Sequence, residues 1–302
     1  MRPLSAILDE DDVRRLLSIR DLVPAVERAL AELSAGRAVQ PLRTVIPVAD
    51  HEGFLGVMPA YAGALGAKLV TFFPDNRDVH THHAIVVLFR PETGEPLVIM
   101  DGRLLTEMRT GAVSAAATKA LARADASVLA ILGSGVQARS HLEALRLVRN
   151  FREVRVWSPR RAKEFAEEFV VQAADSAEGA VRGADVVVVA TTSKTPVLHG
   201  EWLSPGAHVN AVGASRPDWR ELDDDVLSRA RIFVESREAA SRESGDVIAA
   251  GRIDGEIGEV FAGKAPGRTS AQEITLFKSV GVAVEDLAAA DLVYRAATRK
   301  ES

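Results

Sequence analysis

The segment ILGSGVQARSHLEAL, residues 131–145, decides the fold of the central part of this chain. An apolar run of the strand type, residues 128–132, leads into it, and apolar residues then recur at helical spacing from Ala138 onward. Gly133 and Gly135 therefore lie at a strand-to-helix turn, where the first allows the tight turn and the second lets a pyrophosphate approach the backbone. The third position holds Ala138, which that fingerprint tolerates. The segment predicts a dinucleotide-binding turn.

Strand-like and helix-like segments alternate around and after this turn. The strand-like runs are SVLAIL, EVRVW, DVVVVA, HVNAV and RIFVE. This alternation predicts an α/β domain with a parallel, doubly wound sheet of the Rossmann type.

The region before the turn follows another pattern. Short β runs (RTVIPV, FLGVMPAY, GAKLVTFF, HAIVVLF and PLVIM) are separated by turns rich in Gly, Pro, Asp and Asn, which predicts a mostly antiparallel sheet. Residues 9–35 read as two helices with Asp9 and Asp21 as N-caps, and RLLTEMRTGAVSAAATKALA and VAVEDLAAADLVYRAATRK read as two more. Because the five β runs have no helix between them, we expect a symmetric partner chain to cover one face of their sheet.

Composition narrows the function classes. The 302 residues are 47% hydrophobic and 26% charged, as in soluble globular proteins, and the net charge of −5 argues against nucleic acid or an anionic membrane as a partner. The absence of cysteine excludes disulfides, thiolate metal sites and cysteine nucleophiles. The acidic N-terminal sequence has no signal-peptide core, and no apolar run reaches the ~18–20 residues of a membrane span, so a cytoplasmic location is expected.

The end of the second strand of the doubly wound sheet indicates the nucleotide. NAD-binding folds usually carry Asp or Glu there, whereas EVRVW is followed by Ser158, Pro159, Arg160 and Arg161. Guanidinium groups match a 2′-phosphate, so the sequence favours NADPH (NADP+) over NADH, with NADH still possible. The alternative is an exposed arginine pair that begins the next helix and serves only solubility.

Several polar residues in the first part of the chain are candidates for a functional or a purely structural role. Lys68, inside an apolar strand, either reaches an edge with its amine or points into a site with a shifted pKa. Arg109 lies either on a solvated helix face or, given the small residues after it, where a ligand comes close. Arg43 reads as an edge charge at the start of a strand. His80, His82 and His83 look like a cluster, but no further ligand is near in sequence, so no metal site is predicted.

A family resemblance connects these residues. LGVMPAY, KLVTF, MRTGAVSA, ILGSGVQA, HVNAVGASRPDWREL, ESGDVI, GEV and FKSVGVAVED follow one another along nearly the whole chain. Together they resemble the ornithine cyclodeaminase and μ-crystallin family, and most of all its μ-crystallin branch of NADPH-dependent ketimine reductases. The resemblance implies a Rossmann domain, residues 113–284, inserted into an α+β antiparallel-sheet domain, residues 1–112 plus 285–302, that binds substrate and forms a homodimer.

The resemblance also assigns roles to residues. Lys68 and Arg109 match the catalytic positions, with Arg109 gripping the α-carboxylate of the substrate. The substrate-binding positions are Arg43, Met58, Lys68, Arg109 and Ser215. The cofactor-binding positions are Thr81, Arg109, Gly133, Gly135, Val136, Gln137, Ser158, Arg160, Arg161, Thr191, Val212, Gly213 and Ser279.

One departure separates the subfamilies. Cyclodeaminases and the related alanine dehydrogenases carry an aspartate where this chain has Ser215. A neutral hydroxyl cannot replace a carboxylate as a general base at neutral pH, so this position favours a reductase.

Three functions are therefore compared. The leading one is NADPH-dependent reduction of small cyclic ketimines that carry an α-carboxylate. The second is an ornithine cyclodeaminase-type lyase or an alanine dehydrogenase-like oxidoreductase; a cyclodeaminase would show no net consumption of NADPH or NADH. The third is a non-catalytic, NADPH-dependent ligand-binding protein, which would turn over no imine.

Overall fold

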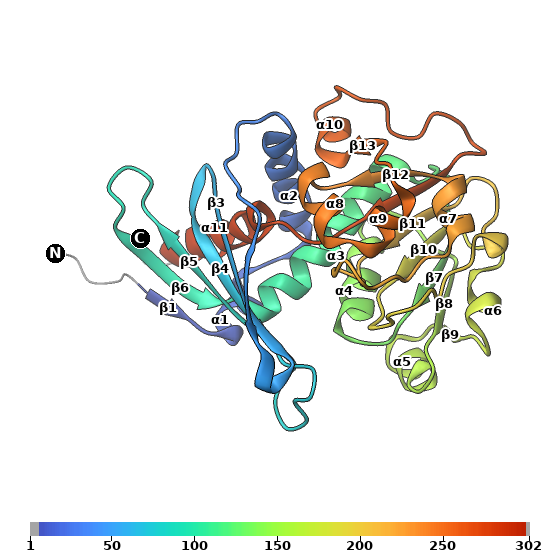
Figure 1. The fold of residues 1–302 in the computed structure, drawn as a ribbon, viewed down its shortest axis with the longest axis horizontal. Helices are drawn as coiled ribbons and strands as arrows, with labels where there is room; N and C mark the ends of the chain where they lie inside the picture. Colours follow the sequence, from blue (N-terminus) through green and yellow to red (C-terminus); the bar gives the residue numbers. More distant parts are fainter. Residues whose placement is uncertain (1–5, 300–302) are drawn as a thin grey trace. The chain divides into compact units, whose positions relative to one another are not determined.

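The computed structural model describes residues 6–299, which divide into two compact units. Among the described residues, those up to Arg109 and those from Val282 onward form the first unit, and Thr110–Gly281 form the second. The first unit is thus built from both ends of the chain, and the second is inserted between them in sequence (Figure 1). None of the described helices is both long and apolar enough to cross a membrane.

A six-stranded sheet forms the framework of the first unit, in the order β1-β6-β5-β4-β3-β2. Strands β2 to β6 pair antiparallel, as the sequence predicts. The three-residue β1 pairs parallel with β6 and makes the sheet mixed; a strand this short leaves no periodic pattern to recognise. The strands are β1 (Ala6–Leu8), β2 (Thr44–Val48), β3 (Gly53–Ala62), β4 (Ala64–Phe72), β5 (His82–Phe89) and β6 (Pro96–Asp101), with a 3-10 turn η1 (Ala49–His51).

Helices cover one face of this sheet. Helix α11 (Ala283–Arg299) packs against β3, β4 and β5, and α2 (Ile19–Ser34) packs against α11. Helix α1 (Glu10–Leu16) begins at the predicted cap Asp9, whose carboxylate accepts from the Asp12 N–H at 2.9 Å. The prediction for Asp21 was wrong, because Ser18 occupies the N-cap position of α2 and Asp21 lies in its first turn, where an acidic side chain still complements the helix dipole.

The strand register places Met58 on β3, Lys68 on β4 and Val86 on β5 side by side on one face. All three are buried. Side chains alternate between the two faces of a strand, so the neighbouring row of Val57, Leu69 and Ile85 lies on the other face. The sheet therefore has one covered face that carries a lysine and a second face that is apolar and partly exposed.

The second unit contains an eight-stranded parallel sheet in the order β13-β12-β14-β11-β10-β7-β8-β9. The five predicted strands are present, and every neighbouring pair is parallel. Three strands were missed: β9 and β13 are two residues long, and β14 is a five-residue run that ends in a lysine. The strands are β7 (Val128–Leu132), β8 (Glu153–Trp157), β9 (Gln172–Ala173), β10 (Val186–Val189), β11 (His208–Ala211), β12 (Ala230–Val234), β13 (Gly255–Glu256) and β14 (Ile274–Lys278).

The helices that connect these strands are short, and helix α3 precedes the first strand, β7. Strands β7, β10, β11 and β14 consist almost entirely of buried residues, as expected for a parallel sheet at the centre of a domain. The helices are α3 (Arg103–Leu121), α4 (Val136–Leu145), α5 (Ala162–Phe169), α6 (Ala177–Val181), α7 (Asp224–Arg229), α8 (Arg237–Glu243), α9 (Gly245–Ala250) and α10 (Ile257–Phe261), with a 3-10 turn η2 (Gly200–Trp202).

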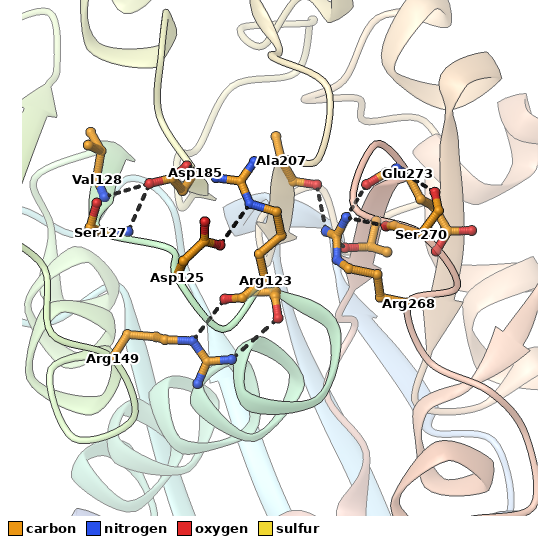
Figure 2. Close-up of polar contacts among 12 residues, drawn as sticks. Arg123, Asp125, Ser127, Val128, Arg149, Asp185, Ala207, Arg268, Ser270 and Glu273 are labelled. Atoms are coloured by element: carbon orange, nitrogen blue, oxygen red, sulfur yellow. Dashed lines mark hydrogen bonds and ion pairs between the residues drawn. The ribbon is translucent and has the colours of Figure 1, made fainter.

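A polar network ties together the end of α3 and the amino edge of this sheet (Figure 2). Arg268 donates to the carbonyl of Leu121 at 2.7 Å, and the Arg149 guanidinium lies 3.3 Å from several of the last carbonyls of α3. Cations are favoured here because the last carbonyls of a helix carry its partial negative charge. On the same edge Asp185 accepts from the Val128 N–H and pairs with Arg123 at 2.5 Å. The amino edge of the sheet is thereby occupied by structural contacts.

Candidate active site

The glycine turn lies at the carboxyl end of β7, as the sequence predicts. Gly133 has φ of +123°, and a Cβ there would collide with the carbonyl of Ala190, which follows β10. Only glycine fits this position. Strands β7 and β10 are also the neighbours at which the strand order reverses, and in doubly wound sheets ligands bind outside the carboxyl ends at such a point.

The start of helix α4 can receive a pyrophosphate. Its N-cap is Gly135, which offers no side chain to the first-turn N–H groups, and nothing lies within 4 Å of the place where a Cβ of Gly135 would stand. Val136 is exposed at the first helical position, and the Gln137 side-chain oxygen is buried without a hydrogen-bond partner among the described residues. Open backbone N–H groups at a helix N-terminus bind anions, so the turn fits the phosphates of a dinucleotide.

The tip of β8 carries the predicted ribose-end residues. The Ser158 hydroxyl lies 2.9 Å from the Ser134 hydroxyl, which connects this tip to the glycine turn, and it accepts from the Arg161 N–H at 3.1 Å. Arg160 and Arg161 are both exposed, and Arg161 pairs with Glu164 at 3.1 Å. The tip therefore presents two guanidinium groups and a hydroxyl next to the glycine turn.

Four further predicted cofactor positions follow the central strands. Thr191 comes after β10, Val212 and Gly213 come after β11, and Ser279 comes after β14. Val212 donates to the carbonyl of Val189, and Ser279 donates to that of Ala211, both at 2.9 Å. All four residues lie at the carboxyl edge, the same edge as the glycine turn.

A buried ionic network that the sequence did not reveal lies behind these loops. Glu221 accepts hydrogen bonds from both the N–H and the hydroxyl of Thr191, and Lys278 at the end of β14 donates to the carbonyl of Gly213. Asp246 lies 3.5 Å from the Lys278 amine. Burial raises the pKa of Glu221 to about 7, with the charge of Asp246 adding to the effect and Lys278 and Thr191 opposing it.

In the first unit the structure joins the two predicted catalytic cations through one carboxylate. The Lys68 amine lies 2.6 Å from one oxygen of Asp286, and the Arg109 Nε donates to the other at 2.9 Å. Arg109 also donates to Glu285 at 2.6 Å. The carboxylates come from the first turn of α11, and Lys68 shares its face of the sheet with Met58.

Burial decides between the readings left open by the sequence. Lys68 is 2% exposed and Arg109 is 4% exposed. Burial therefore excludes a lysine that reaches the sheet edge and an arginine on a solvated helix face. Burial lowers the pKa of Lys68 to about 8, helped by the charges of Arg109 and Arg43 and opposed by Asp286. Burial alone would raise the pKa of Asp286, but Arg109 and Lys68 outweigh it and hold that pKa below its ordinary value. The cluster therefore pairs an ionised carboxylate with a lysine whose pKa is about 8.

Arg43 directly precedes β2 and is half-buried, and its charge reaches Lys68. Thr81 precedes β5, and its hydroxyl lies 3.1 Å from the ring of His82. The described residues contain no group of three His, Cys, Asp or Glu side chains that could hold a metal ion. Ser215 is exposed in the loop after β11 of the second unit. Within the first unit the structure gathers the predicted substrate positions Met58, Lys68 and Arg109, with Arg43 nearby.

Sequence reasoning did not identify the carboxylates of either cluster, Glu285 and Asp286 in the first unit and Glu221 and Asp246 in the second. Glu285 and Asp286 stand together in a helix otherwise rich in Ala, and Lys278 ends an apolar strand. A charged residue inside an apolar element is a signal of a buried partner, because an unpaired buried charge is costly. The identity of that partner is not visible in any local pattern: Asp286 lies 177 residues from Arg109 in the sequence.

Comparisons with known proteins agree along the whole chain. The model of the ornithine cyclodeaminase/mu-crystallin family matches residues 5–301. The chain is 50% identical to the ketimine reductase mu-crystallin of Rattus norvegicus, with 97% of this chain and 98% of that protein covered. Among solved structures it is similar to Thermococcus litoralis Δ1-pyrroline-2-carboxylate reductase in complex with NADH and L-proline, with a TM-score of 0.93, 39% identity and 98% of both chains covered. An archaeal alanine dehydrogenase dimer with bound NAD gives a TM-score of 0.93 at 37% identity, covering 99% of this chain and 97% of that one.

Proposed function

The chain belongs to the ornithine cyclodeaminase/mu-crystallin family, and we propose that it reduces the C=N bond of small cyclic ketimines that carry an α-carboxylate, with NADPH as the preferred reductant. The observation that carries this proposal is the buried cluster in which Asp286 holds both Lys68 and Arg109. Such a cluster fixes two cations in a defined geometry, which is what orientation of a carboxylate requires.

The second unit binds the dinucleotide. Gly133, Gly135 and the uncapped start of α4 receive the pyrophosphate, and the loops after β10 and β11 receive the nicotinamide half. When bound, the reduced nicotinamide supplies a hydride for the imine carbon. The residues of this unit bind and orient the cofactor.

The first unit provides for the substrate. Asp286 holds the cationic groups of Lys68 and Arg109 close together, and the charge of Arg43 also reaches Lys68, which favours a bound carboxylate. Reduction of a C=N bond also needs one proton at nitrogen. Lys68, whose pKa is about 8, is largely protonated at neutral pH and holds that proton at its amine. Arg109 orients the α-carboxylate, and Met58 lies beside Lys68 on the covered face of the sheet.

The preference for NADPH rests on the tip of β8. Arg160 and Arg161 are exposed there, and the tip carries no carboxylate that would hold a free 2′-hydroxyl. The two solved relatives described above hold NADH and NAD, so the proposed preference for NADPH differs from the cofactors bound in those structures.

The protein works as a homodimer through the open face of the first sheet. Ile46 on β2, Tyr61 on β3 and Ile85 on β5 lie on the face opposite the buried lysine row and are 50%, 45% and 44% exposed. An apolar sheet face of this kind needs a cover, and a second copy of the chain is the commonest one.

Steady-state assays with Δ1-pyrroline-2-carboxylate test the proposed activity. We expect loss of the nicotinamide absorbance with NADPH and a smaller rate with NADH, and formation of a cyclic amino acid. Conversion of ornithine to proline with only catalytic NAD, without turnover of the imine, would instead establish the cyclodeaminase activity. Binding of NADPH without turnover of any imino acid would establish a binding protein.

A further inference from the structure

Glu221 connects two loops of the second unit that are distant in sequence. Its Oε1 accepts from the Thr191 N–H at 2.9 Å and from the Thr191 hydroxyl at 2.6 Å, which fixes the loop after β10. Its carboxylate also lies against Gly213 in the loop after β11, so closely that a Cβ at Gly213 would overlap all three atoms of the carboxyl group. Glu221 is fully buried. One rigid side chain therefore sets the spacing of both loops.

The rest of the network holds this side chain in place. Asp246 accepts from the backbone N–H groups of Glu221 and Leu222, both at 3.1 Å, which fixes the backbone that carries the carboxylate. Lys278 donates to the Gly213 carbonyl and pairs with Asp246, so it ties the loop after β11 to the same cluster. Asp246 thus fixes the backbone of Glu221, and the Glu221 carboxylate contacts the two loops.

Two features of this network are energetically unfavourable by themselves. The Glu221 Oε2 atom is buried without a hydrogen-bond partner among the described residues, although such an atom usually has one. Next to Gly213, Ala214 has φ of +49° and is buried, a left-handed conformation that costs free energy for a residue with a Cβ. Strain and unpaired polar atoms of this kind concentrate where a geometry serves a ligand rather than stability.

We propose that Glu221 is a positioning residue that, through Thr191 and Gly213, holds the two loops against which the nicotinamide half of the cofactor binds. The inference rests on the proposed function, because it assumes a nicotinamide cofactor at the carboxyl edge of the sheet. In a doubly wound sheet the two halves of a dinucleotide lie on either side of the switch point, which here falls between β7 and β10. The loops after β10 and β11 belong to the half that does not contain the glycine turn. Glu221 therefore acts on the nicotinamide half and leaves the adenosine half alone.

Binding measurements without substrate test this role. Titration calorimetry is run with NADPH or NADH, whichever the unmodified protein binds more tightly, and with the matching fragment without nicotinamide, ADP-ribose with or without a 2′-phosphate. Glu221→Ala should weaken the complete cofactor about tenfold or more, because two hydrogen bonds to Thr191 are lost, and the fragment less than about twofold. Equal losses for both ligands, or no loss, would overturn the proposal.

A conservative variant separates positioning from mere stability. Glu221→Gln keeps an oxygen for Thr191 and should restore most of the affinity. The ionised carboxylate accepts stronger hydrogen bonds than the amide, and the charged groups that face it are Lys278 on β14 and Asp246 on α9. The cofactor affinity of the unmodified protein relative to Glu221→Gln should therefore rise between about pH 6 and pH 8, across the pKa of Glu221. A constant ratio would contradict the proposal.

A control variant at the opposite edge completes the design. Asp185→Asn weakens backbone contacts of β7 at the amino edge (Figure 2) and should leave the ratio between cofactor and fragment affinity unchanged. A selective loss of cofactor in this control would overturn the proposal.

Three further outcomes are distinguished as follows. If Glu221→Ala does not fold, Glu221→Asp, whose shorter side chain draws the carboxylate away from Thr191, must still weaken the cofactor selectively, by several-fold. An unmodified protein that binds the cofactor but reduces no imine overturns the proposed activity and leaves the binding comparison decisive. One that binds no dinucleotide overturns both.

Discussion

Lys68→Arg tests whether the buried lysine acts through its proton. The pKa of Lys68 is lowered from 10.5 to about 8, first by burial and then by the nearby arginines. The protonated fraction thus falls about tenfold between about pH 7 and pH 9. If the protonated amine is needed for reduction of the imine, kcat/KM of the unmodified protein should fall by the same factor over this range. An arginine stays protonated throughout, so the variant should lack this decrease.

The assay follows the nicotinamide absorbance with Δ1-pyrroline-2-carboxylate from about pH 6.5 to pH 9.5. Titration of the imine itself changes kcat/KM of both proteins by the same factor. The informative quantity is therefore the ratio of kcat/KM between the unmodified protein and Lys68→Arg. A ratio that stays constant from about pH 7 to pH 9, or that rises, would refute a role for the Lys68 proton.

The same pKa has a consequence for stability. The unfolded chain binds a proton at this lysine up to about pH 10.5, whereas the folded protein releases it near pH 8. Because the unfolded state binds more protons in this window, the free energy of unfolding should rise with pH there, by about 3 kcal/mol at 1.36 kcal/mol per pH unit. Urea unfolding at several pH values measures it, and Lys68→Arg should lack the increase. An equal pH dependence of the free energy of unfolding in the two proteins would mean that Lys68 is not desolvated.

Four further predictions concern Arg109, the tip of β8 and the exposed face of the first sheet. Arg109→Lys should raise KM for carboxylated imines about 10- to 100-fold in steady-state assays, because one amine cannot reproduce the contacts of the guanidinium; an unchanged KM would exclude Arg109 from carboxylate binding. Arg109→Ala should in addition cost about 3–5 kcal/mol of stability by denaturant unfolding, since it leaves Glu285 and Asp286 buried with less positive charge. In calorimetry, replacement of both Arg160 and Arg161 by Ala should weaken NADPH binding at least about tenfold and NADH binding less than about twofold. Equal affinity of the unmodified protein for the two cofactors would show that the arginines serve only solubility. Ile85→Asp, which places a charge on the open sheet face, should convert a dimer to a monomer in light scattering, and a variant that stays dimeric would place the interface elsewhere.

Local patterns were sufficient for most of the fold. The glycine turn and the alternating apolar runs are short-range signals, so the Rossmann sheet, the antiparallel pairing of β2 to β6 and helix α3 could be predicted from them. The same holds for the position of Gly133 and Gly135 at the turn between a strand and a helix. Strands of two or three residues, such as β9 and β1, carry too few residues for a period to emerge, and Asp21 showed that a capping residue type does not fix where a helix begins.

The electrostatic centre of each unit was decided by the tertiary structure alone. The sequence left Lys68 and Arg109 with two readings each, because the free energy of a charge depends on its burial and its partners. Only folding brings Asp286, from the last helix of the chain, between a strand lysine and the arginine of α3. In the second unit, folding likewise sets Glu221 against Thr191 and Gly213. Periodicity fixes which residues are strand or helix, but contacts over such sequence distances arise from packing, and packing determines these pKa values.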